Sequence, residues 1–218
     1  SIAFYEISII KKQSALKDSI NLIEKALKLR QYFPPYVCHY VELLIENNNL
    51  SKAKKYLYES WRHFPHPDYK SLIKLLSKKM KVSYFQLADY ITSSTKSLSQ
   101  SKILIAESLI DKQDWIKAKN QLRSLLEHKP SKEVCVLMSI IESGESNDPQ
   151  KINAWISRSN FGELNNIWIC RFSNISQEKW SSVSKNGHFN SLVWKKPASL
   201  TELASSNIES NIIEYINN

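Results

Sequence analysis

The sequence predicts an all-α fold in which pairs of helices stack on one another, followed by a small irregular C-terminal module. Equivalent positions recur every 34 residues, as in the pairs Ser19–Ala53, Ala26–Ser60 and Leu16–Leu50. Only 3 of the 218 residues are glycine, on which sheets and tight hairpins depend. Apolar residues also recur at helical spacing along most of the chain. Together these observations favour helices joined by polar turns.

The repeat length indicates the kind of helical array. Small residues at recurring positions let two helices approach closely, and recurring leucines interlock. Self-similarity at this period is the signature of tetratricopeptide repeats (TPR), which stack as helix pairs into a superhelix. The curved surface of such an array binds other proteins. The sequence therefore predicts a TPR-like right-handed superhelix over residues 1–160.

The helices are expected in pairs along the chain. The first pair covers 2–12 and 14–30, and the second lies between about 34 and 67, with Pro34-Pro35 breaking the chain before it and Ser51 as a possible cap. The third covers 68–80 and 83–97, the fourth lies within 99–132, and the last covers 132–143 and 149–158. Ala118 follows Ala53 by 65 residues, whereas two ideal repeats give about 68, so the third pair is expected to be short.

The character of the chain changes after residue 160. Residues 161–197 are rich in Trp, Ser and Asn and have no helical period, which predicts a small irregular or short-stranded module. Residues 198–218 are polar and predict either a frayed tail or a short helix.

The net charge of +9 leaves three kinds of surface open: a solvated lysine-rich surface, a surface that meets anionic lipid, and one that meets nucleic acid. A basic stripe at helical spacing carries much of this charge; it consists of Lys70, Lys74, Lys78, Lys79 and Lys81. Such a stripe is either a solvated face or a contact with lipid headgroups. No aromatic residues alternate with these lysines, which argues against nucleic acid.

The chain has no G-x-S-x-G, Walker or H-E-x-x-H motif, so neither an enzyme nor a small-molecule substrate or cofactor is expected. His63 and His66 flank a helix end and are expected to be structural. Cys38 and His39 are adjacent and face different directions on a helix. The three widely spaced cysteines predict no disulfide framework and favour a reducing compartment.

The TPR-like arrangement also predicts where a partner binds. The first helix of each pair lines the concave face of such arrays. Mixed apolar and acidic side chains there suit a helical or extended segment that carries some Lys or Arg. The predicted groove residues are Tyr5, Ile9, Lys12, Cys38, Glu42, Ile45, Ile103, Glu107 and Ile110.

Two segments together resemble one known family. One is Trp61-x-x-x-Pro65-His66-Pro67; the other is Trp168-x-Cys170, then Trp180, then Gly187-x-Phe189-x-x-Leu192-x-Trp194-x-x-Pro197. Segments of this kind, in this order after TPR units, resemble those of the HemY-type bacterial membrane-anchored TPR proteins. The resemblance implies a link to haem and porphyrin biosynthesis, and a hydrophobic N-terminal anchor that this sequence lacks. The abrupt apolar start at Ile2 suggests that the sequence is a fragment.

The chain departs from the family pattern where that pattern supplies two C-x-x-C pairs, which suit a zinc ribbon. Cys170 is kept, but Ser173 replaces its partner, and the second pair falls on Val183 and Asn186. His188 could add only a second ligand, so no metal is expected. Packing of aromatic and leucine side chains is expected to hold the module instead, through Trp168, Trp180, Phe189, Leu192 and Trp194.

These observations predict a non-enzymatic protein-binding TPR scaffold. The resemblance places it at the bacterial inner membrane, facing the cytoplasm, where it would bring haem-pathway proteins together. The alternative is a basic peripheral binder of anionic lipid or nucleic acid. Salt dependence separates the two, because electrostatic binding falls steeply as salt rises.

Overall fold

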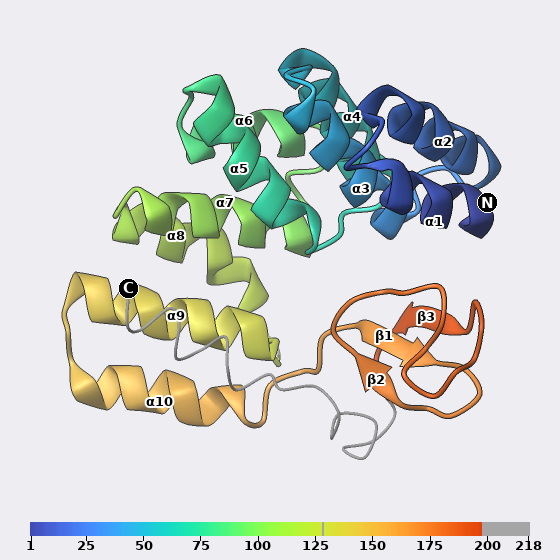
Figure 1. Cartoon of the computed structure of the whole chain (residues 1–218). Coiled ribbons are helices and arrows are strands. Elements are labelled where there is room, and N and C mark those ends of the chain that lie inside the picture. Colours follow the sequence, from blue (N-terminus) through green and yellow to red (C-terminus); the bar gives the residue numbers. More distant parts are fainter. Residues whose placement is uncertain (128, 198–218) are drawn as a thin grey trace. The chain divides into compact units, whose positions relative to one another are not determined.

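The computed structural model describes residues 1–127 and 129–197, and most of these residues are helical (Figure 1). They form ten α-helices, one short 3-10 helix and three short strands. The prediction of a mainly helical chain is thus confirmed in its coarse form. The chain divides into two compact units, Ser1–Gln121 and Leu122–Asn218.

The first unit consists of consecutive helices joined by short turns, and it extends into the last turn of the eighth helix. The helix pairs predicted for this part of the chain are present, with ends that differ by a few residues from those expected. The helices are α1 (Ile2–Lys11), α2 (Leu16–Leu29), α3 (Pro34–Glu46), α4 (Leu50–His63), α5 (Tyr69–Met80), α6 (Tyr84–Thr92), α7 (Ser99–Asp111) and α8 (Trp115–Leu122).

The helix ends follow from local chemistry. Pro34 and Pro35 occupy the first positions of α3, where a missing backbone N–H costs nothing, so they start this helix. Asn49 caps α4, because its side chain accepts a hydrogen bond from the backbone N–H of Lys52. The prediction that Ser51 is the cap is therefore wrong: Ser51 already lies inside the first turn of α4.

Small side chains allow the helices of the first unit to pack closely. Each small residue of the repeat pattern is 0% exposed, as expected for positions between helices; these are Ser19, Ala26, Ala53, Ser60, Ala106 and Ala118. Trp61 is the largest side chain in this core and is also 0% exposed. Its indole N–H donates a hydrogen bond to Ser101 Oγ over 2.9 Å, which links α4 to α7.

Contacts between alternate helices arrange the first unit in rows. Besides the contacts between consecutive helices, α3 packs on α5 and α4 packs on α6. Ser8 of α1 contacts His39 of α3, and Lys70 of α5 contacts Glu107 of α7. The helices α1, α3, α5 and α7 therefore form one row, and its exposed side is called the odd-helix face below.

The second unit begins with the 3-10 helix η1 (Arg123–Leu125) and a helical hairpin of α9 (Lys132–Glu145) and α10 (Pro149–Ser159). Each helix of the hairpin has a side-chain cap, Ser131 for α9 and Asp148 for α10. The hairpin belongs to the same compact unit as the residues that follow it. The predicted boundary at residue 160 coincides with the end of α10, whereas the division between units falls after Gln121.

The all-α prediction needs one correction, because a three-stranded antiparallel sheet follows α10. Its strands are β1 (Ile167–Cys170), β2 (Ser176–Gln177) and β3 (Leu192–Lys195), in the order β2-β1-β3. Branched and aromatic side chains in β1 and β3 favour extended backbone. Trp168 of β1 lies opposite Trp194 of β3, with ring centroids 5.1 Å apart.

A glycine connects this sheet to the preceding hairpin within the second unit. The backbones of Ser131 and Glu163 form an isolated bridge, and the N–H of Lys132 donates to the carbonyl of Glu163 over 3.1 Å. A Cβ atom on Gly162 would lie 2.7 Å from the backbone nitrogen of Lys132. The close approach of these two segments therefore requires glycine.

One prediction and one general property remain to be stated for the fold. The tail or short helix expected at 198–218 lies outside the described residues. Among residues 1–127 and 129–197, no helix combines the length and the apolar character needed to span a bilayer.

Candidate functional site

The odd-helix face carries the predicted groove residues, but not all of them are accessible. Ile9 is 41% exposed. Ile45 and Ile103 are only 6% and 2% exposed, so they belong to the core and leave little surface for a partner. The remaining six are half-buried on α1, α3 and α7 or directly after α1; they are Tyr5, Lys12, Cys38, Glu42, Glu107 and Ile110.

Aromatic and ionic contacts hold α1 against α3 on this face. Tyr5 stacks on Tyr36 with ring centroids 5.0 Å apart and meets the edge of His39 at 5.6 Å. The Lys12 ammonium lies 2.6 Å from a carboxylate oxygen of Glu46 and 3.8 Å from one of Glu42. The structure therefore brings together two of the predicted groove residues, Lys12 and Glu42, and places Tyr5 against other residues of α3.

A buried polar cluster lies beneath these contacts. Ser8 Oγ donates to the carbonyl of Ser19 over 2.8 Å, and Ser19 Oγ donates to the carbonyl of Ser8 over 2.7 Å. His39 Nε2 lies 2.9 Å from Ser8 Oγ and is its donor, because the Ser8 proton is already engaged. Burial lowers the pKa of His39 to about 4, so its ring is neutral at physiological pH. The cluster joins α1, α2 and α3 without introducing a charge.

Cys38 lies next to this cluster on α3. Burial raises the pKa of its thiol well above the ordinary value, and the nearby carboxylates of Asp68 and Glu42 add to the effect. The neutral thiol is a poor nucleophile, because the thiolate is the reactive form. The environment of Cys38 therefore suits a packing contact better than covalent chemistry.

Two lysines of the predicted basic stripe form ion pairs with α7. Lys70 Nζ lies 2.8 Å from Glu107 Oε1, with side chains only 13% and 19% exposed. Lys74 Nζ lies 2.7 Å from Asp111 Oδ1, with side chains 43% and 41% exposed. The sequence analysis assigned Lys70 and Glu107 to separate surfaces. Lys70 and Glu107 are 37 residues apart, and so are Lys74 and Asp111. This equal spacing was the available signal that the two helices pair through both lysines.

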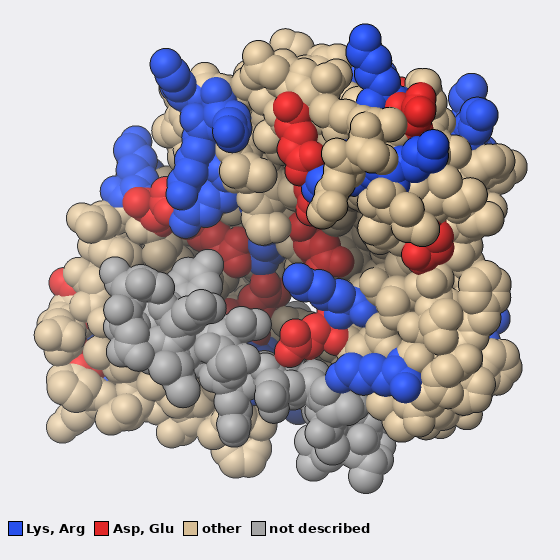
Figure 2. All heavy atoms as spheres, viewed as in Figure 1, with Lys and Arg blue, Asp and Glu red and all other residues tan. Residues whose placement is uncertain are grey.

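The rest of the stripe lies at the C-terminal end of α5. Lys78, Lys79 and Lys81 are exposed, and no ion pair reaches them from residues 1–127 or 129–197. Positive charge at a helix C-terminus is stabilised by the helix dipole, which gives these lysines a structural role in any case. On the face shown in Figure 2, basic side chains are interspersed with acidic ones.

The histidines of the Trp61–Pro67 segment do not converge. His63 stacks on Tyr32 with ring centroids 4.1 Å apart. His66 is 0% exposed, packs against Phe64 and Tyr69, and has its pKa lowered by burial to about 3. Each ring thus has a packing role of its own.

Cys170, at the end of β1, has different surroundings from Cys38. Its Sγ atom lies 3.3 Å from Ser191 Oγ and 3.6 Å from His188 Nδ1. The thiol donates to Ser191 Oγ, whose own proton goes to the carbonyl of His188. Burial raises the pKa of Cys170, but the nearby hydroxyls of Ser173 and Ser191 and the backbone N–H groups of Ser173 and Phe172 outweigh this effect. The net result is a pKa of about 5, which favours a thiolate at neutral pH.

The other residues of the ribbon-like motif form a second turn. The N–H of Ser184 donates to the carbonyl of His188, and Gly187 has a positive φ of 79°. Val183 and Asn186 occupy this turn where the family pattern has cysteines. A four-thiolate metal site does not fit one thiol, and within 1–127 and 129–197 no three His, Cys, Asp or Glu residues group around a possible ion.

Most of the aromatic and leucine side chains that were predicted to pack in the module are buried or half-buried around Trp168. Trp168, Trp180 and Leu192 are 2%, 8% and 3% exposed, and Trp194 lies half-buried against Trp168. Phe189 is 65% exposed, so the prediction that it packs in the module is wrong. It lies in the second turn, where its backbone pairs with that of Val183.

No protein-family model matches this chain, and no curated protein matches it either. The assignment of candidate residues therefore depends on geometry, burial and charge. The odd-helix face carries both apolar and ionic side chains, among them Ile9, Ile110, Lys12 and Glu42.

Proposed function

We propose that the chain is a non-enzymatic protein-binding scaffold built as a TPR-like right-handed superhelix. The observation that carries this proposal is the odd-helix face, where helices that are distant in sequence form one row. The buried small residues at 34-residue spacing support the repeat interpretation. A rigid row of helices presents a surface that needs no rearrangement to bind.

The chemistry of the face indicates the kind of partner. Ile9 and Ile110 offer apolar contact area, and the same face carries the ion pairs Lys12–Glu42 and Lys70–Glu107. A helical or extended protein segment with apolar residues and some Lys or Arg would complement this mixture. The resemblance to HemY-type proteins extends the proposal to a membrane-tethered scaffold that gathers haem-pathway proteins on the cytoplasmic side of the inner membrane.

A site-specific photocrosslinker tests the proposal directly. It would replace Ile9 or Ile110 on the odd-helix face, and the matched control would replace the exposed Lys55 of α4. With native membranes as the source of partners, the same protein adducts should form from both face positions and not from Lys55. Equal labelling at all three positions, or none at the face, would contradict a partner site on this face.

The exposed lysines at the end of α5 favour a second candidate function, a contact with anionic lipid. Each basic residue near such a surface contributes about 1 kcal/mol of attraction. Replacing Lys78, Lys79 and Lys81 with glutamine should weaken binding to phosphatidylserine vesicles. A control triple of exposed lysines elsewhere, Lys11→Gln, Lys17→Gln and Lys55→Gln, should have less effect. Equal losses would indicate only the overall charge.

A further inference from the structure

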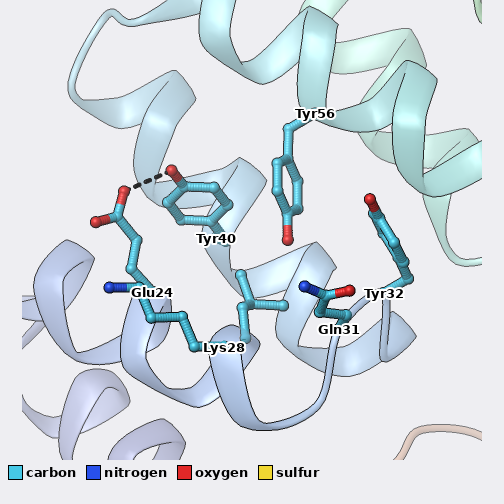
Figure 3. Close-up of a pocket in the computed structure, with 7 residues that line it drawn as sticks. Glu24, Lys28, Gln31, Tyr32, Tyr40 and Tyr56 are labelled. Atoms are coloured by element: carbon cyan, nitrogen blue, oxygen red, sulfur yellow. Dashed lines mark hydrogen bonds between the residues drawn. The ribbon is translucent and has the colours of Figure 1, made fainter.

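A pocket of about 250 Å³ lies in the first unit between α2, α3, α4 and the turn that joins α2 to α3 (Figure 3). Three tyrosines from three different segments line it: Tyr32 from the turn, Tyr40 from α3 and Tyr56 from α4. The ring of Tyr40 meets that of Tyr56 edge to face, with centroids 4.8 Å apart. This pocket lies apart from the predicted groove residues, none of which lines it.

The polar groups on one side of the pocket already have hydrogen-bond partners. The hydroxyl of Tyr40 donates to Glu24 Oε1 over 2.7 Å, and Lys52 Nζ donates to the same oxygen over 2.9 Å. Burial raises the pKa of Glu24, but these hydrogen bonds and the positive charge of Lys52 and Lys28 lower it overall. Glu24 is thus ionised, and its charge is balanced by Lys52.

On the opposite side of the pocket, Tyr32 has an uncommon backbone conformation. Tyr32 has a φ of 51°, in the left-handed region that bulky residues rarely adopt. Its ring stacks on His63 of α4 at 4.1 Å, which fixes the phenol at the edge of the pocket. Backbone strain of this kind, of order 1–3 kcal/mol, is concentrated at ligand and active sites.

Three polar groups in the pocket have no hydrogen bond from the described part of the chain: the Tyr56 hydroxyl, the Gln31 amide and the Lys28 ammonium. In Figure 3 the ring of Tyr56 stands between Tyr40 and Tyr32, and its hydroxyl points toward Gln31. Burial raises the pKa of Tyr56, so this hydroxyl remains a neutral donor. The Tyr56 hydroxyl and the Gln31 amide thus lie together, whereas the Lys28 ammonium extends to the side of Glu24.

We propose that this pocket binds a planar aromatic ring that carries a carboxylate. The faces and edges of three phenol rings suit an aromatic group. Lys28 and Lys52 place two positive charges around the single carboxylate of Glu24, so this side of the pocket keeps a net positive charge for an anionic ligand. Tyr56 and Gln31 supply hydrogen-bond donors for carboxylate oxygens. At roughly 30 Å³ for a water-sized group, the volume holds on the order of ten non-hydrogen atoms, which is one ring with a short acidic side chain.

Fluorine NMR of 4-fluorophenylacetate with the whole chain tests the proposal. A ligand of this size should bind with a dissociation constant of about 1 mM. The neutral analogue 4-fluorophenylacetamide and the non-aromatic carboxylate cyclohexylacetate, used as a competitor, should each bind at least about fivefold more weakly. They separate the contribution of the charge from that of the ring.

Two variants and one control locate the site. Lys28→Gln and Tyr56→Phe should each weaken binding of the probe by about fivefold, the effect of one lost polar contact. Lys17→Gln, on the same helix but outside the pocket, should leave binding unchanged. All three sites are at least partly exposed, and circular dichroism would verify that the variants keep their helices.

Short peptides identify the source of the carboxylate. A peptide that ends in phenylalanine with a free carboxylate should displace the probe if the natural ligand is a protein C-terminus. If the peptide fails while the probe binds, the ligand is a free aromatic acid, and the pocket chemistry stands in both cases. Absence of probe binding at several millimolar, equal binding of the amide, or full affinity in both pocket variants would overturn the proposal.

Discussion

Ionisable groups inside the first unit are kept neutral, whereas Cys170 beside the sheet of the second unit favours its charged form. In the helical unit, His39 and His66 are buried and have pKa values lowered to about 4 and about 3, and Cys38 has a raised pKa. All three are therefore neutral near physiological pH. Beside the sheet, the pKa of Cys170 is instead lowered to about 5.

The number of donors around each group explains this difference. His39 has one hydroxyl neighbour, and Cys38 lies near carboxylates, so burial dominates and disfavours charge. The turn after β1 directs the backbone N–H groups of Phe172 and Ser173 at the sulfur of Cys170, and these donors favour the charged thiolate. Burial alone thus does not determine the charge of a group in this protein.

The largest expected effect is the titration of Cys170. Thiolate absorbance in the ultraviolet should rise with a midpoint at about pH 5, whereas Cys38 and Cys135, whose pKa values are raised, should contribute only in alkaline solution. The variant Cys170→Ser should lose the acidic step. If the native chain showed no such step, Cys170 would be a neutral thiol like Cys38, and the contrast between the two regions would disappear.

The same shift makes the sheet region sensitive to pH. The pKa of Cys170 is lower in the folded than in the unfolded chain, so its contribution to stability is complete only above the unfolded pKa. It is lost as pH falls through about 5. Hydrogen exchange of the β1 and β3 amides should therefore accelerate as pH falls toward 5, relative to intrinsic exchange rates. Cys170→Ser should abolish that dependence.

The histidines give the next largest effect. Their folded pKa values lie below the unfolded value of 6.5, so their contribution is complete above pH 6.5 and is lost as pH falls. For His39, the free energy of unfolding should decrease by about 3 kcal/mol between pH 6.5 and about 4, at roughly 1.4 kcal/mol per pH unit. Urea unfolding followed by circular dichroism measures it. His39→Gln keeps a donor for Ser8 but cannot titrate, so a pH slope as steep as that of the parent would exclude His39 as its source.

The smallest effect concerns the ion pairs between α5 and α7 of the helical unit. A double-mutant cycle on the mostly buried pair Lys70–Glu107 should give a coupling of about 1.5 kcal/mol, and one on the exposed pair Lys74–Asp111 about 0.5 kcal/mol. Added salt should reduce the second coupling more than the first. Equal couplings in both cycles would show that burial does not strengthen ion pairs between α5 and α7.

Much of the helical unit could be predicted from the sequence because its signals are local. Spaced small residues such as Ala53 and Ala118 located the helix contacts, and both are fully buried. The ion pairs of Lys70 and Lys74 could not be predicted, because they depend on how α5 and α7 are aligned after folding. Sequence spacing alone assigned these lysines to a basic stripe, either a solvated face or a contact with lipid headgroups.

The environment of Cys170 could be predicted only in part. Its pattern with Trp168 and Trp194 indicated a compact module, and the two tryptophans do pack together. The polar groups that surround its sulfur come from a turn and from Ser191, which lies 21 residues away, so no linear motif announces them. The pocket around Tyr56 was missed for the same reason, since its tyrosines come from three segments.

Gly162 limits how this chain can vary. A methyl group at this position would collide with the backbone of Lys132, which cannot move aside as a flexible side chain could. Any substitution must therefore open the bridge between Ser131 and Glu163 that connects the α9–α10 hairpin to the sheet segment. Among descendants of this sequence, drift at surface lysines should be common, whereas position 162 should tolerate no other amino acid.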